Sequence, residues 1–130
     1  MRTHTSFIKV RYAETDQMGV VHHSNYLKYF ELARIEWLDS LEISYKWMEE
    51  KGVMLPVHKV VIDYIKPARF DDLLEIEVSL RKIPTVRIVF DYVIHNKDRE
   101  IITTGMTELI FVNSNSKKPI RCPEYILNKL

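Results

Sequence analysis

The segment SNYLKYFELARIEWLDSL, residues Ser24 to Leu41, decides the fold that this sequence predicts. Its apolar residues recur at spacings of three and four, and they are Tyr26, Phe30, Ala33, Trp37 and Leu41. This is the period of an α-helix with one buried face. We therefore expect one long helix here, and either Ser24 or Asn25 can cap its N-terminus.

Strands are predicted on both sides of this helix. Residues 7–12 alternate between apolar and polar side chains, and residues 13–19 carry turn formers that indicate a loop. A short helix is expected at residues 44–51, and a terminal helix at residues 124–130. The strands that follow the short helix are predicted at residues 57–65, 74–80, 86–94 and 101–112, with a β-bulge at Gly105.

This order of elements predicts an α+β fold in a single domain, residues 1–130, with a five-stranded antiparallel sheet covered by the long helix. The strand at residues 101–112 is partly apolar on both faces, so the helix cannot cover all of the sheet. A second copy of the chain is the simplest way to cover the remainder. We therefore expect a homodimer or a homotetramer.

Composition excludes several classes of protein. Hydrophobic residues make up 46% and charged residues 28% of the chain, which excludes general disorder. The formal net charge of +1 gives no broad positive field, so nucleic-acid binding is not expected. The single cysteine, Cys122, cannot form an internal disulfide. With no signal peptide and no membrane span predicted, a cytoplasmic location is expected.

The polar loop before the long helix can carry chemistry. Asp16, His22 and His23 lie in it, and it runs into the helix N-terminus, where free N–H groups favour an oxyanion. A carboxylate there can act as general base or nucleophile. From spacing alone, the preferred interpretation of Asp16 is a loop residue that only accepts backbone N–H groups. Adjacent histidines make a poor chelating pair, so no metal and no cofactor are expected.

Two runs of residues resemble one known family. The first is Tyr12-x-Glu14-Thr15-Asp16-x-x-Gly19-Val20-Val21-x-His23-x-x-Tyr26-x-x-x-Phe30-Glu31, and the second is Tyr64-Ile-Lys-Pro67-Ala68-Arg-Phe70-Asp71-Asp72-Leu73-Leu74. Both resemble the 4-hydroxybenzoyl-CoA thioesterase family of the hotdog-fold superfamily. Where relatives often carry Tyr or Phe this chain has His22, and where they often carry a small residue it has Met18.

The resemblance implies a hotdog fold, hydrolysis of acyl-CoA thioesters, and a site between subunits. It assigns the catalytic carboxylate to Asp16 and a second polar catalytic group to His23. Gly19, Val20, Val21, Asn25 and Tyr26 are expected to contact the substrate. Glu31 is expected to orient the catalytic groups without contacting the substrate itself, although an ion pair with Arg34 at i, i+3 is the ordinary interpretation.

Other functions remain open from the sequence. The substrate can be a thioester of CoA or of an acyl carrier protein. A hotdog hydratase or dehydratase acting on an acyl thioester is one alternative, and it needs an acid and a base beside the acyl chain. A non-catalytic protein that binds acyl thioesters is another.

Overall fold

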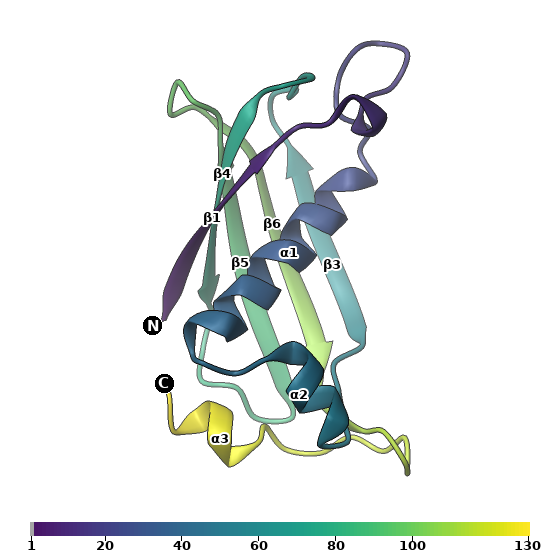
Figure 1. The fold of residues 1–130 in the computed structure, drawn as a ribbon, viewed down its shortest axis with the longest axis vertical. Coiled ribbons are helices and arrows are strands. Elements are labelled where there is room, and N and C mark those ends of the chain that lie inside the picture. The colour runs from purple at the N-terminus through teal and green to yellow at the C-terminus, as the bar shows by residue number, and fades with distance from the viewer. Residues whose placement is uncertain (1) are drawn as a thin grey trace.

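The computed structural model describes residues 2–130, in which a sheet curls around one helix (Figure 1). The strands are β1 (Thr3–Lys9), β2 (Val53–Met54), β3 (Val57–Tyr64), β4 (Leu73–Leu80), β5 (Arg87–His95), β6 (Ile101–Ile110) and β7 (Val112–Asn113). The helices are α1 (Asn25–Ser40), α2 (Tyr45–Glu50) and α3 (Glu124–Leu127), and a 3₁₀ turn spans Tyr12–Glu14.

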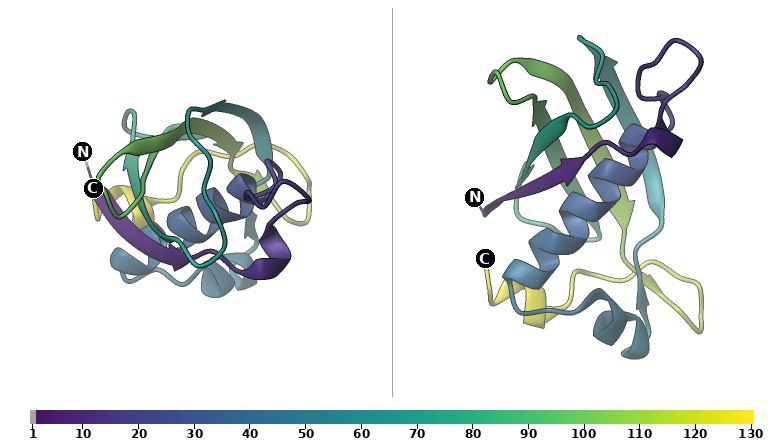
Figure 2. Two further views of the ribbon diagram at one scale, coloured as in Figure 1. Left: turned by 90° about the horizontal axis from the view of Figure 1, so that it is seen from above. Right: turned by 45° about the horizontal axis from the view of Figure 1, so that its top comes forward.

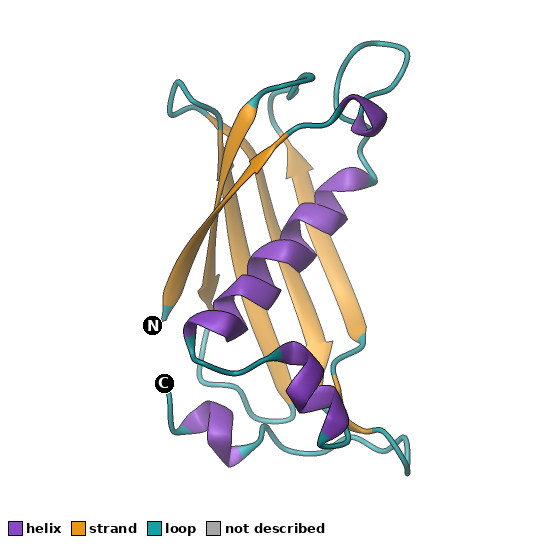
Figure 3. Ribbon diagram, in the orientation of Figure 1, coloured by secondary structure: helices purple, strands orange, loops and turns teal. Residues whose placement is uncertain are grey.

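The main sheet is antiparallel and has the strand order β1-β4-β5-β6-β3. The short strands β2 and β7 form a separate pair. The expected α+β fold, five antiparallel strands around one long helix, is therefore confirmed (Figure 3). This order leaves β1 and β3 as the two edges of the sheet.

Helix α1 lies in the concave side of the sheet, which Figure 2 shows curling around it from above. The helical stripe predicted from the sequence is the side that is buried there. Phe30 stacks on Tyr92 with ring centroids 4.1 Å apart, and Trp37 meets Phe90 edge to face at 5.1 Å. Among residues 2–130, no helix combines the length and the apolar character that crossing a membrane requires.

Gly105 on β6 gives Phe30 the room to make this contact. A Cβ atom at residue 105 would lie 2.5 Å from two carbons of the Phe30 ring. The predicted bulge at Gly105 was wrong, because the β5–β6 register shifts between Ile94 and His95, where Ile102 is the extra residue. Gly105 occurs in this strand because a buried aromatic ring takes the place of a side chain.

Local signals misplaced several boundaries. The first strand spans Thr3–Lys9, and the 3₁₀ turn at Tyr12–Glu14 takes up part of the range that was predicted as strand. The last long strand ends at Ile110, and the terminal helix ends at Leu127. Neither expected cap is formed: the Ser24 hydroxyl bonds with the His22 ring, and the Asn25 side chain bonds to the Glu14 carbonyl.

We predict that Gly105→Ala destabilises the protein by about 1–3 kcal/mol, because the new methyl group forces the buried Phe30 ring to move. Urea unfolding followed by circular dichroism measures this. The double variant Gly105→Ala, Phe30→Leu should lose less than the sum of the two single variants. An unchanged free energy of unfolding in Gly105→Ala would contradict the contact.

Candidate active site

A tight turn shapes the polar loop ahead of α1. The Gly19 N–H donates to the Asp16 carbonyl and the Asp16 N–H donates to the Val20 carbonyl, both at 2.9 Å. Thr15 and Val21 pair as an antiparallel bridge at the base of the turn. Gly19 has a φ of +78°, which glycine adopts without strain. The loop therefore has a defined conformation, in which Asp16 is the first residue of the turn.

The Asp16 carboxylate is held by one of its two oxygens. Oδ1 accepts the Met18 N–H at 2.8 Å and the Val20 N–H at 3.4 Å. Among residues 2–130, no hydrogen bond uses Oδ2. The backbone bonding that a purely structural Asp16 would make is therefore present, and the second oxygen is still available to a ligand.

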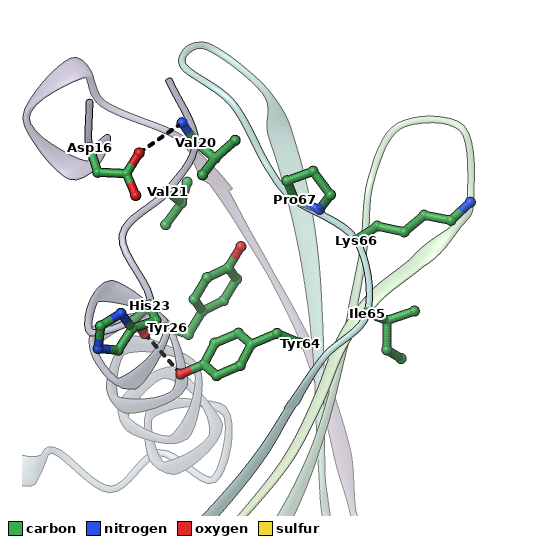
Figure 4. A pocket seen from close by; sticks show the side chains of 9 residues that line it. All are labelled: Asp16, Val20, Val21, His23, Tyr26, Tyr64, Ile65, Lys66 and Pro67. Atoms are coloured by element: carbon green, nitrogen blue, oxygen red, sulfur yellow. Dashed lines mark hydrogen bonds between the residues drawn. The ribbon is translucent and has the colours of Figure 1, made fainter. Parts of the chain in front are cut away.

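This carboxylate lies at the edge of a hollow of about 340 Å³ (Figure 4). The loop and the first turn of α1 supply one wall, and the end of β3 with the turn after it supplies the other. The lining residues are Asp16, Val20, Val21, His23, Tyr26, Tyr64, Ile65, Lys66 and Pro67. The hollow, called the pocket below, thus joins Asp16 to His23 and to the positive end of the α1 dipole.

Tyr64 closes the pocket from the side of β3. Its hydroxyl donates to the His23 carbonyl at 3.1 Å, and its ring meets the Tyr26 ring edge to face at 5.3 Å. The Ile102 carbonyl, at the bulge of β6, accepts the N–H groups of Ile65 and Lys66 and so holds the rim. Sequence analysis assigned these rim residues no role, although the second family-like run begins at Tyr64.

The structure brings five of the eight predicted site residues to the pocket: Asp16, His23, Val20, Val21 and Tyr26. Gly19 lies in the turn behind Asp16, and Asn25 is buried, with its side-chain amide donating to the Glu14 carbonyl at 2.8 Å. Glu31 lies farther along α1, where its mostly exposed carboxylate is 3.7 Å from Arg34. These three do not line the pocket.

Glu14 is a buried carboxylate beside the pocket. Its Oε1 accepts the Arg11 N–H at 2.8 Å and the Tyr29 hydroxyl at 2.9 Å, and the Arg11 guanidinium lies 3.3 Å from Oε2. Burial raises the pKa of Glu14, but these three donors outweigh it and hold the pKa below its usual value. Burial and the Glu14 carboxylate raise the pKa of Tyr29. The pair is therefore a carboxylate that accepts from a neutral phenol.

Other chemical groups are not arranged for a reaction. Burial raises the pKa of the Cys122 thiol to about 12, which keeps it protonated and a poor nucleophile at neutral pH. Across residues 2–130, no three His, Cys, Asp or Glu side chains come together as metal ligands could. The rings of His22 and His23 lie 4.2 Å apart, so they do not point apart as regular alternation predicts.

Comparison with known proteins assigns the family. Residues 10–130 match the thioesterase-like superfamily. The chain belongs to this superfamily. It is 37% identical to YneP of Bacillus subtilis over 88% of this chain and 83% of that protein. It is 30% identical to the acyl-CoA thioester hydrolase YbgC of Escherichia coli over 92% of this chain and 90% of that protein.

The solved structures agree with the sequence matches. The thioesterase superimposes on the DHNA-CoA thioesterase of Staphylococcus aureus with a TM-score of 0.92 and 37% identity, over 98% of this chain and 86% of that chain. The expected hotdog fold is confirmed by this similarity and by the observed sheet and helix. The expectation of an enzyme that hydrolyses thioesters is confirmed as well.

The low pKa of Glu14 makes the stability of the thioesterase depend on pH. A carboxyl whose pKa is lowered by folding stabilises the folded state above its unfolded pKa of about 4.5. This contribution is lost as the pH falls through the folded pKa. Glu14→Gln should therefore be less stable than the parent by about 1–3 kcal/mol at pH 7.

We expect this difference between parent and Glu14→Gln to shrink steadily below about pH 4.5. Urea unfolding at a series of pH values measures it. Glu77→Gln, which changes an exposed carboxylate on β4, is the control and should show little difference at any pH. If the difference in free energy of unfolding between the parent and Glu14→Gln stays constant with pH, the network does not stabilise the charged form of Glu14.

Proposed function

We propose that the thioesterase hydrolyses acyl-CoA thioesters to the free acid and CoA, with Asp16 as its catalytic carboxylate. The observation that carries this proposal is the geometry of Asp16, whose Oδ1 is held by backbone N–H groups while Oδ2 is left to the pocket. The names of the related proteins YbgC and DHNA-CoA thioesterase support acyl-CoA as the substrate class.

In the proposed reaction, Asp16 takes a proton from water as the water oxygen bonds to the thioester carbon. The N-terminus of α1 stabilises the oxyanion that forms through its dipole and its remaining N–H groups, since those of Asn25 and Tyr26 already donate to the His22 and His23 carbonyls. Oxyanion donors of this kind are worth roughly 10² to 10³ in rate. The carbon–sulfur bond then breaks, the protonated Asp16 gives its proton to the departing sulfur, and CoA leaves as the thiol. Alternatively, Asp16 attacks the carbon itself, the carbon–sulfur bond breaks, and CoA leaves as a thiolate that solvent protonates. Water then hydrolyses the mixed anhydride to the free acid and the Asp16 carboxylate.

The remaining pocket residues have supporting parts in this proposal. His23 orients the carboxylate or the water, and Tyr26 lines the acyl site with Val20 and Val21. We also assign the chain to the 4-hydroxybenzoyl-CoA thioesterase branch of the superfamily, because most of the quoted Asp16–Tyr26 motif residues border the pocket. The acyl preference is to be found with a panel of aromatic and aliphatic acyl-CoAs and acyl carrier protein thioesters.

We predict that Asp16→Asn lowers kcat by roughly 10² to 10⁴ with a smaller effect on KM, because the amide keeps the shape but cannot accept the proton. Release of CoA thiol, measured with a thiol reagent, gives both constants. His23→Gln should reduce kcat less. Thermal melts on the same preparations separate activity from folding, and near-parental kcat in folded Asp16→Asn would exclude the mechanism.

We further propose that the thioesterase is a homo-oligomer that pairs along β3. Every residue of this edge strand except Ile62 is exposed, including the apolar Val57, Val60 and Val61. The strand also ends in Tyr64, at the pocket. A second copy added to this edge would cover the apolar residues and lie beside the pocket.

The expected mass by light scattering at micromolar concentration is therefore a multiple of 15.5 kDa, for a dimer or a tetramer. The double variant Val60→Lys, Val61→Lys should shift the mass towards the monomer, because it puts a cation on both faces of β3. Phe7→Lys, on the opposite edge strand β1, is the control and should leave the mass unchanged. A parental mass of 15.5 kDa would rule out the assembly.

A further inference from the structure

Glu14 connects the two ends of the loop that carries Asp16. The Glu14 carbonyl accepts the His22 N–H at 2.8 Å, which closes the loop at its base. The same carbonyl accepts the side-chain amide of Asn25 at 2.8 Å, so the closure is tied to the first turn of α1. One backbone oxygen therefore sets the distance between the Asp16 turn and the helix N-terminus.

The side chain of Glu14 makes a second connection to α1. Its carboxylate accepts the hydroxyl of Tyr29, which lies one turn beyond Asn25 on the buried side of the helix. The Arg11 N–H and guanidinium hold the same carboxylate from the other side. Glu14 is only 8% exposed, so solvent does not compete strongly for these bonds. Loop and helix are thus joined at two points by one residue that lies two positions from Asp16.

We propose that Glu14 and Tyr29 are positioning residues of the hydrolytic reaction, which hold Asp16 in register with the N–H donors at the start of α1. This inference rests on the proposed function, since it concerns the same two catalytic parts. The Asp16 carboxylate comes from the loop and the N–H donors come from the helix, and the Glu14 contacts join the two. A displacement of about 1 Å between reacting groups can cost about 10²-fold in rate.

The test compares two buried tyrosines that differ in what their hydroxyls hold. Tyr29→Phe removes the 2.9 Å bond to Glu14, and Tyr92→Phe removes the 2.6 Å bond to Thr107, within the sheet and outside the pocket. We expect Tyr29→Phe to lower kcat by roughly 10-fold with KM within about 2-fold of the parent. Tyr92→Phe should leave kcat unchanged although it also lowers the melting temperature. Equal kcat in both variants and the parent would overturn the proposal.

Substitutions at Glu14 provide a second test of the positioning role. Glu14→Gln retains an acceptor oxygen for Arg11 and Tyr29, whereas Glu14→Ala removes it. In the folded proteins, well below their melting temperatures, kcat should fall by roughly 10² in Glu14→Ala and should be partly restored in Glu14→Gln. The same kcat in Glu14→Ala and the parent would also contradict the proposal.

Failure of the positioning proposal can be distinguished from failure of the proposed function. If Asp16→Asn is inactive while Tyr29→Phe matches the parent, Asp16 acts but does not depend on this network, and the positioning role is wrong. If folded Asp16→Asn keeps the parental kcat, the assignment of Asp16 as the catalytic carboxylate is wrong. The proposed positioning role of Glu14 and Tyr29 is then wrong as well.

Discussion

The packing of α1 into the concave side of the sheet is the constraint on which the rest of the structure depends. Phe30 can stack on Tyr92 only because Gly105 has no side chain on the strand beneath it. This contact fixes the depth of the helix in the sheet. Because the helix is rigid, its depth also places its first turn between the polar loop and the end of β3. The pocket is therefore a consequence of core packing.

Two descriptions of Asp16 that exclude each other in the sequence coexist in the structure. A loop-stabilising aspartate accepts backbone N–H groups, and a catalytic aspartate offers an oxygen to the substrate. Asp16 does the first with Oδ1 and has Oδ2 free for the second. Fixing one oxygen to the backbone lowers the rotational freedom of the side chain, so the structural bonds support the proposed chemistry by preorganising it.

The two walls of the pocket are constrained to different degrees. The loop and α1 are joined by the buried Glu14 network, whereas the opposite wall comes from the edge strand β3 and the turn after it. Tyr64 connects the two walls through the His23 carbonyl. A strand with one unpaired edge and two exposed faces is the least constrained part of this arrangement. Pairing of β3 in an oligomer would therefore stabilise the wall of the pocket that is least constrained within one monomer.

Local patterns in the sequence were sufficient for the long helix, the alternating strand β4 and the α+β class, because these follow from periodicities of a few residues. They also brought Asp16, His23 and Tyr26 together, since these residues are neighbours in the chain. Only the tertiary structure decided that Tyr64 faces His23, 41 residues away, and that the Tyr29 hydroxyl bonds to Glu14. It also decided that Gly105 makes room for a ring and that Asn25 is buried. Such contacts depend on which strands pair and how deeply the helix packs, and no short stretch of sequence contains that information.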